Sequence, residues 1–229
     1  MRSEIDAIAF DIDGTLYPDW SFYRRLAPFL LANARFLSEF GRVRKLIRVW
    51  QEAHPGEKHD DFFAWQAGLM APYLGCTAAE ARVILNQKIY EGWKPLFARV
   101  RPYPHLIETF GACRAAGLKI GILSDFLPSQ KGDLWGLAPL CDAIVGAEET
   151  GALKPSPVPF LALSAALNVL PERILYVGNS LRSDVRGASP VGMKTACIIN
   201  PVAAALGRKV PGADISFSGY RQLTRIVLK

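Results

Sequence analysis

Five short apolar runs, each ending at a polar turn, limit the folds open to this 229-residue chain more than any other feature. Both alternations along each run are apolar, as in strands of a sheet that is covered on both faces. Helical patterns separate most of the runs, and such alternation predicts parallel strands joined by right-handed crossovers. The predicted strands are residues 5–10, 118–123, 143–145, 174–177 and 195–199, and the predicted helices are 104–116, 156–168 and 182 to about 191.

The segment from residue 18 to residue 99 interrupts this alternation. Its apolar residues recur at helical spacing, and it contains no convincing strand. Turns that contain proline, at 17–18 and 101–104, mark its two ends. A helical cap hinged over the strand ends would exclude water from a reaction there. We therefore expect an α/β core made of residues 1–17 and 100–229, with an α-helical cap of residues 18–99 inserted into it.

The composition and net charge of the chain indicate which kinds of molecule it can bind. The formal net charge of +6 favours anionic partners, such as a small phosphorylated metabolite. No run of five or more basic residues and no stripe of aromatic residues interleaved with Lys and Arg occurs, so we expect no nucleic-acid partner. No stretch approaches the roughly 20 apolar residues of a membrane span, and Glu4 and Asp6 are unlike a signal peptide, so we expect a cytoplasmic protein without a membrane partner.

The four cysteines are far apart, which argues against a zinc site or a disulfide framework. The sequence carries no signal for an oligomeric state.

Two carboxylates follow the first predicted strand, in the segment Asp11-Ile12-Asp13-Gly14-Thr15. With one residue between them, one carboxylate can be aimed at a substrate while the other lies beside it. An ionised carboxylate can attack phosphorus or carbon, and a protonated one can donate to a leaving oxygen. Asp and Gly are also common turn formers, so the segment alone leaves a purely structural role open.

Two further strand ends offer groups that bind phosphate. Ser124 follows the second predicted strand, where its hydroxyl and nearby backbone N–H groups can hold phosphate oxygens. Lys154 precedes Pro155, which favours an extended backbone at the lysine. Its ammonium group can offset the charge of a phosphoryl group. Each feature alone also has an ordinary explanation, as a turn or as an exposed lysine.

A fourth polar segment, residues 178–184, follows the fourth predicted strand and contains Asn179 and Asp184. Together with the first segment these side chains form an oxygen-only donor set, which suits a hard cation such as Mg²⁺. A helix cap by Ser180 or Ser183, with Asp184 in the first turn, is the structural alternative.

Taken in order, D-I-D-G-T, a serine after an apolar strand, K-P and G-N-S-x-x-S-D-V resemble the haloacid dehalogenase superfamily of hydrolases. The resemblance covers residues 5 to about 200, and the helical segment after the first motif looks like the cap of that family. It implies a Rossmann-like core and a phosphatase that acts on a small phosphomonoester. In such an enzyme Asp11 attacks phosphorus to give an aspartyl-phosphate, and Asp13 serves as general acid and then base. Ser124 and Lys154 hold the phosphoryl oxygens.

The resemblance also implies Mg²⁺ as cofactor. Its ligands would be the Asp11 carboxylate, the Asp13 backbone carbonyl, Asp184 and the position of Asn179. The fourth motif of the family usually begins Gly-Asp, so Asn179 replaces a charged ligand with a neutral one. We expect weaker binding of the ion, or a larger contribution from Asp184.

Three other functions are open. A dehalogenase would use the same aspartate on carbon without a metal, but Asp13 argues against it, because halide leaves without a proton. A degenerate member that binds phosphate without turnover would account for Asn179. Phosphonate cleavage would need a lysine in the cap, and nothing distinguishes the candidates Lys45, Lys58, Lys88 and Lys94.

Substrate specificity in this arrangement would depend on cap residues that face the core. Our candidates lie shortly after the first motif and are Tyr23, Arg24 and Arg25. Three further arginines are interpreted as a solvated helix face, namely Arg42, Arg44 and Arg48.

Overall fold

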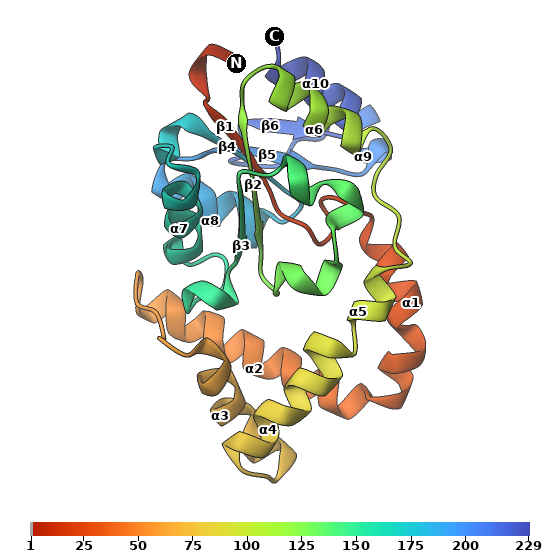
Figure 1. Cartoon of the computed structure of the whole chain (residues 1–229), viewed down its shortest axis with the longest axis vertical. Helices are drawn as coiled ribbons and strands as arrows, with labels where there is room; N and C mark the ends of the chain where they lie inside the picture. Colours follow the sequence, from red (N-terminus) through yellow and green to blue (C-terminus); the bar gives the residue numbers. More distant parts are fainter. Residues whose placement is uncertain (1) are drawn as a thin grey trace.

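The computed structural model describes residues 2–229, so Met1, the first residue of the predicted core, lies outside the described residues. Its centre is a six-stranded sheet in the order β3-β2-β1-β4-β5-β6 (Figure 1). Every neighbouring pair is parallel. The predicted Rossmann-like α/β core is therefore confirmed. The strands are β1 (Ala7–Phe10), β2 (Lys119–Ser124), β3 (Ala143–Gly146), β4 (Ile174–Gly178), β5 (Lys194–Ile198) and β6 (Ile215–Phe217).

Strand β1 lies inside the sheet, between β2 and β4. Its last residue, Phe10, pairs with Ile122 of β2 and Val177 of β4. The three strands therefore end side by side, and the polar segments that follow them meet at one edge of the sheet.

Burial of the strands matches the prediction except at one edge. All four residues of β1 are buried, whereas Ile144 of β3 is 39% exposed. The expectation that β3 is covered on both faces is wrong, because β3 is an edge strand. The other edge, β6, was not predicted from the sequence, because three residues carry too little periodicity.

Helices cover both faces of the sheet (Figure 1). On one face Ile8 and Phe10 pack in a cluster with α6 and α10, and the Phe10 ring stacks on Phe110 at 4.5 Å. On the other face Ala7 and Ala9 pack with α7, where their small side chains let the helix come close. These helices are α6 (Leu106–Ala115), α7 (Pro157–Leu167), α8 (Arg186–Ala188) and α10 (Tyr220–Val227), and the short α9 (Pro201–Ala205) precedes β6.

The helix predicted at 182 to about 191 is broken into three turns. A π-helical turn at Leu181–Val185 leads into α8 and then into a 3₁₀ turn at Ser189–Val191. The helix predicted at 156–168 is α7, which begins after Ser156 and ends before Asn168. The Ser156 side chain accepts a hydrogen bond from the backbone N–H of Val158, as an N-cap does.

The chain between β1 and α6 is helical, and this helical insertion lies beyond the carboxyl ends of the strands (Figure 1). The backbone N–H of Tyr103 donates to the carbonyl of Leu16 at 2.8 Å, so the two ends of the helical insertion meet. None of the helices in residues 2–229 combines the length and apolar character that crossing a membrane requires. The inserted helices are α1 (Asp19–Ala32), α2 (Ala34–Ala53), α3 (Phe62–Leu74), α4 (Ala78–Leu85), a π-helical turn (Asn86–Glu91) and α5 (Lys94–Phe97).

Candidate active site

Three predicted site residues meet at the sheet edge in a buried charge cluster. The Nζ atom of Lys154 lies 2.7 Å from Oδ1 of Asp11 and 2.7 Å from Oδ1 of Asp184. All three side chains are buried. They come from the loops after β1 and β4 and from the segment before α7, so the parallel topology brings them together.

Burial controls the electrostatics of this cluster. It raises the pKa of Asp11 to about 7, although the ammonium group of Lys154 works in the opposite direction. Burial also works against the charge of Lys154, but Asp11 and Asp184 outweigh it and raise the pKa of the lysine well above its ordinary value. The ammonium group of Lys154 therefore stays charged between the carboxyl groups of Asp11 and Asp184.

Local hydrogen bonds fix both carboxylates. The Thr15 hydroxyl donates to Oδ2 of Asp11 at 2.9 Å. Oδ2 of Asp184 accepts from the backbone N–H groups of Asn179 and Ser180, at 3.1 and 2.9 Å. The Ser180 side chain also caps the following turn by accepting from the Ser183 N–H. The structural alternative of a cap by Ser180 is thus correct, and it coexists with the contact between Asp184 and Lys154.

The side chain of Asp184 lies so close to the backbone of residue 178 that only glycine fits at this position. A Cβ atom at this position would lie 2.3 Å from Cγ of Asp184. Real Cβ atoms do not approach side chains this closely, so any other residue would displace the carboxylate from Lys154.

A second lysine, Lys131, completes the site and was missed by sequence reasoning. Its Nζ atom lies 3.0 Å from Oδ2 of Asp13 and 3.1 Å from Oγ of Ser124. Lys131 ends the 3₁₀ turn Pro128–Lys131 after β2 and its side chain is fully buried. The only signal in the sequence was a basic residue shortly after a strand end, which is too common to single out.

Asp13 is held on its other oxygen by Tyr17. The Tyr17 hydroxyl donates to Oδ1 of Asp13. Burial, together with the charge of Asp13, raises the pKa of Tyr17 far above its ordinary value, so the phenol keeps its proton. The carboxylate of Asp13 is therefore oriented from both sides by hydrogen-bond donors.

Asn179 contacts a carboxylate that the sequence did not point to. Its Nδ2 atom donates to Oδ2 of Asp19, in the first turn of α1, at 3.3 Å. This contact passes close to Gly14, which has a φ of +78° and at which a Cβ would lie 1.9 Å from Nδ2 of Asn179. Burial, followed by the charge of Asp13, raises the pKa of Asp19. A fourth carboxylate, of Asp19, thus lies beside Asn179, the neutral residue that stands where the family usually has an aspartate.

Helix α2 connects the helical insertion to the loops that follow β2 and β3. Arg48 donates from Nε to the backbone carbonyl of Lys154 at 3.1 Å and from its guanidinium to Oδ2 of Asp125 at 2.7 Å. Asp125 in turn accepts from the Lys154 N–H at 2.9 Å. Arg44 is 5% exposed and forms an ion pair with Glu148, which follows β3.

The interpretation of these arginines as a solvated helix face is therefore wrong for Arg44 and Arg48. The reason is that this face of α2 packs against polar loop ends instead of water, so charged residues are paired there. The Arg42 side chain is 60% exposed and fits the interpretation.

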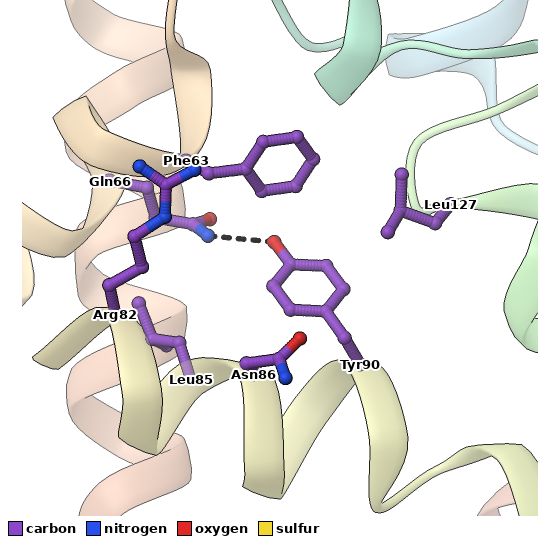
Figure 2. A pocket seen from close by; sticks show the side chains of 7 residues that line it. All are labelled: Phe63, Gln66, Arg82, Leu85, Asn86, Tyr90 and Leu127. Carbon is purple, nitrogen blue, oxygen red and sulfur yellow. Dashed lines mark hydrogen bonds between the residues drawn. The ribbon is translucent and has the colours of Figure 1, made fainter.

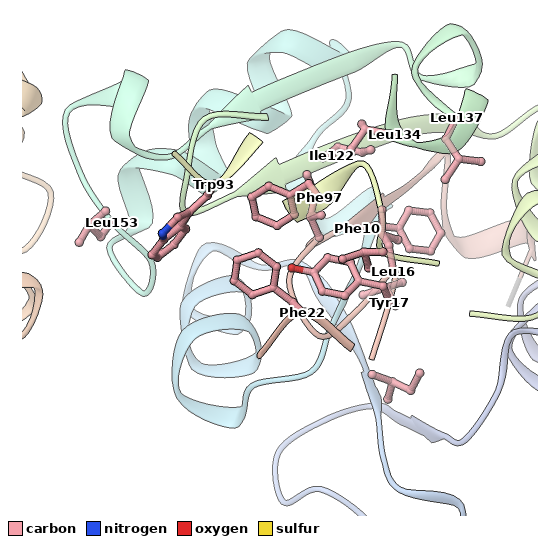
Figure 3. Packing of buried hydrophobic residues seen from close by; sticks show 14 of the residues in the cluster. Phe10, Leu16, Tyr17, Phe22, Trp93, Phe97, Ile122, Leu134, Leu137 and Leu153 are labelled. Carbon is pink, nitrogen blue, oxygen red and sulfur yellow. The ribbon is translucent and has the colours of Figure 1, made fainter. Parts of the chain in front are cut away.

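Several cavities lie beside the helical insertion, and two of them differ in their lining. One, of about 210 Å³, opens beside Asp13 and is lined mainly by rings, some of which Figure 3 shows. Of the three candidate specificity residues only Tyr23 lines it, because Arg24 lies over Trp20 and Arg25 binds the Ser21 carbonyl. The other cavity, of about 240 Å³, is lined mostly by α3 and α4 and contains none of the predicted site residues (Figure 2).

The order of the motifs in the chain has a counterpart among known proteins. Residues 5–192 match the family described as haloacid dehalogenase-like hydrolases. The chain belongs to this family. It is accordingly a hydrolase, and the resemblance stated from its motifs is confirmed.

Relatives within the family share most of their length with this hydrolase. Glyceraldehyde 3-phosphate phosphatase of Methanopyrus kandleri is 32% identical over 200 residues, 83% of this chain and 82% of that protein. Phosphoglycolate phosphatase of Aquifex aeolicus is 33% identical over 202 residues, 82% of each chain.

Solved structures share the fold of this hydrolase. HAD phosphatase from Thermococcus onnurineus has a TM-score of 0.61 and 24% identity, over 97% of this chain and 98% of that chain. L-2-haloacid dehalogenase from Xanthobacter autotrophicus has a TM-score of 0.64 and 21% identity, over 98% of each chain. At these identities the likeness establishes the fold alone.

The donor set of this hydrolase fits the Mg²⁺ that its family implies. Within residues 2–229, no cluster of three or more His, Cys, Asp or Glu side chains is arranged as a metal site. The predicted ligands are instead two carboxylates, of Asp11 and Asp184, with the amide oxygen of Asn179 and the backbone carbonyl of Asp13. Mg²⁺ typically takes one or two protein carboxylates and keeps several waters, so two carboxylates and neutral oxygens suit it.

Proposed function

We propose that this hydrolase is a Mg²⁺-dependent phosphatase that cleaves a small phosphomonoester through an aspartyl-phosphate on Asp11. The observation that carries the proposal is the buried contact of Lys154 with both Asp11 and Asp184, beside a third carboxylate on Asp13. Relatives that are named as phosphatases support the same class of reaction.

In the first step the Asp11 carboxylate attacks phosphorus and the bond from phosphorus to the substrate oxygen breaks. Asp13, in its protonated form, donates its proton to that oxygen, so the leaving group departs as an alcohol. The ammonium groups of Lys154 and Lys131 neutralise charge on the transferred group, which is the main requirement of phosphoryl transfer. Ser124, which binds Lys131, would hold a phosphoryl oxygen.

In the second step Asp13 accepts a proton from a water molecule that attacks the aspartyl-phosphate. Phosphate leaves and the Asp11 carboxylate is restored. Mg²⁺, held by Asp11, the Asp13 carbonyl, Asn179 and Asp184, would supply further neutralisation of the phosphoryl charge. Thr15 and Tyr17 keep the two aspartates in their orientations through both steps.

We further propose that residues 18–99 act as a cap over a core of residues 1–17 and 100–229. The contacts of Arg48 with Asp125 and Lys154 support this division, because they bind α2 to the loops that carry the chemistry. A closed cap would keep bulk water away from the aspartyl-phosphate. We also propose that the enzyme is cytoplasmic, where it would act on small phosphorylated metabolites.

The dehalogenase alternative is supported by fold alone. Carbon–halogen cleavage has no use for a proton donor, whereas Asp13 is held in place by Tyr17 and Lys131. The arrangement of Asp13 therefore favours phosphate ester cleavage. It also disfavours a degenerate binding protein, which needs neither a nucleophile nor an acid.

The test is phosphate release from p-nitrophenyl phosphate and a panel of sugar phosphates and nucleotides, with Mg²⁺ and with a chelator. We expect Mg²⁺-dependent release that Asp11→Asn abolishes. Asp60→Asn, at an exposed position of the helical insertion, is the matched control and should behave like the native protein. Release that survives Asp11→Asn, or no release from any compound, would refute the proposal.

A further inference from the structure

The cavity beside Asp13 is built from rings that come from four separate parts of the chain. Six of its nine lining residues are aromatic, and Leu26 adds an aliphatic side chain. The rings come from the loop after β1, from α1, from the end of the helical insertion and from the loop after β2. They are Tyr17, Phe22, Tyr23, Trp93, Phe97 and Phe126.

Contacts among the rings make the walls of this cavity rigid. Phe22 stacks on Phe97 with ring centroids 4.5 Å apart. Trp93 meets Phe22 edge-on at 5.7 Å and Phe126 edge-on at 5.4 Å. Phe22, Trp93 and Phe97 are all buried (Figure 3). A substrate therefore meets a preformed apolar surface next to the predicted proton donor.

The charges around the cavity select against anions. Its two acidic lining residues are Asp13 and Asp19, and among the described residues no lysine or arginine lines it. Lys131 lies over the Phe97 ring at 5.0 Å, but its Nζ donates to Asp13 and Ser124. Its charge is therefore directed to the residues that would bind the phosphoryl group, and not to the leaving group. An anionic leaving group would face the Asp19 carboxylate without a free cation, which is unfavourable, and Asp13 offers it no positive charge while it carries the proton for the leaving oxygen.

We propose that the leaving group of the substrate is an uncharged alcohol with an apolar body about one ring in size. This inference rests on the proposed phosphatase function, since it concerns the alcohol whose oxygen Asp13 protonates. The volume of about 210 Å³ is below the ~300 to 1,000 Å³ of typical ligand sites, so the body is small. The proposal separates this enzyme from its relative named for phosphoglycolate, whose leaving group is an anion.

The experiment compares kcat/KM for four alkyl phosphates, measured by phosphate release with Mg²⁺. They are 2-phenylethyl phosphate, glycerol 3-phosphate, phosphoglycolate and phosphocholine. None has an activated aryl leaving group, so the comparison reports recognition of the alcohol. We expect 2-phenylethyl phosphate to exceed glycerol 3-phosphate by at least about tenfold and phosphoglycolate to be the poorest, because ring burial and charge both act in this direction.

Variants connect the preference to the cavity. Tyr23→Ala removes a ring that is 57% exposed, so folding is preserved, and it should lower the ratio of kcat/KM for the phenylethyl and glycerol esters. Phe22→Ala should lower this ratio further, and its folding is checked by thermal unfolding. Trp20→Ala, on the same helix but outside the cavity and 64% exposed, should leave the ratio unchanged.

The outcomes separate the inference from the function on which it rests. Hydrolysis that favours glycerol 3-phosphate or phosphoglycolate would overturn the inference and leave the phosphatase proposal standing. A preference for phosphocholine would also overturn it, because the carboxylates would then be selecting a cation. No hydrolysis of any ester, including p-nitrophenyl phosphate, would overturn both.

Discussion

The ammonium group of Lys131 lies 3.0 Å from a carboxylate oxygen of Asp13, in a position where its side chain is fully buried. Asp11 has an equivalent partner in Lys154, at 2.7 Å. Each aspartate of the first motif therefore has its own lysine. Two fixed cations beside the reacting group suit a reaction whose barrier is lowered chiefly by neutralising charge.

We expect Lys131→Met to lower kcat/KM for phosphate release by about 10²- to 10³-fold, the typical effect of removing one preorganised charge from a transition state. The assay is Mg²⁺-dependent release from p-nitrophenyl phosphate. Lys209→Met, at an exposed position, is the control. A loss of less than about threefold in the Lys131 variant would show that the second lysine is structural.

Asn179→Asp should tighten Mg²⁺ binding by about tenfold, because the affinity of such sites follows the number of charged ligands. Isothermal titration of the protein with Mg²⁺ measures the dissociation constant directly. The exposed Asn86→Asp adds the same charge far from the site and should leave the constant unchanged. An unchanged or weaker constant for Asn179→Asp would contradict the assignment of this position as a ligand.

Gly178→Ala should cost about 1 to 3 kcal/mol of unfolding free energy, as overpacked sites typically do, and should also remove activity. The added Cβ would lie 2.3 Å from Cγ of Asp184 and would displace it from Lys154. Urea unfolding and phosphate release are the two measurements. Gly111→Ala in α6 has open space around its Cβ and should keep full activity. An active Gly178→Ala enzyme would mean that the Asp184 contact is dispensable.

Stability should depend on pH through Glu148. Burial raises its pKa to about 7 from an ordinary 4.5, although Arg44 works in the opposite direction. A carboxyl whose pKa is raised on folding stabilises the protein fully below its unfolded pKa, and this contribution is lost as the pH rises through the folded pKa. The unfolding free energy contributed by Glu148 should therefore decline between about pH 4.5 and about pH 7.

The partner of Glu148 provides the test. Arg44→Met leaves a buried carboxylate without its cation, so we expect a loss of about 3 to 5 kcal/mol at pH 8 and a smaller loss at pH 5.5, where Glu148 is protonated. Urea unfolding at both pH values measures it, with the exposed Arg42→Met as control. Equal losses at the two pH values would show that Glu148 does not titrate in this range.

The part of the site that could be predicted from the sequence is the part that lies at strand ends. Asp11 and Asp184 directly follow strands or the turn after one, and parallel strands deliver such residues to one edge. Lys131 could not be found in this way, because it reaches Asp13 only through the path of the loop after β2. Asp19 was missed for the same reason, since its position depends on how α1 leaves the loop after β1.

The arginines of α2 show a different limit. Helical spacing correctly places Arg44 and Arg48 on one face of a helix, but spacing does not say what that face contacts. A charged face is usually solvated, and here it packs against Glu148 and Asp125 instead. The aromatic cavity could not be predicted from the sequence either, because its rings come from segments far apart in the chain.

The hydrogen bond from the Tyr103 N–H to the Leu16 carbonyl has a consequence for how enzymes of this kind diversify. It joins the chain on either side of the helices at a single stem, so a segment of another length or sequence can be accommodated there without shifting the register of the sheet. Natural variation can thus exchange in one event the segment that supplies most of the rings of the aromatic cavity, namely Phe22, Tyr23, Trp93 and Phe97. Asp11, Asp13, Lys131 and Lys154 lie outside this segment and would be inherited unchanged, so a lineage would acquire new substrates while retaining its old chemistry.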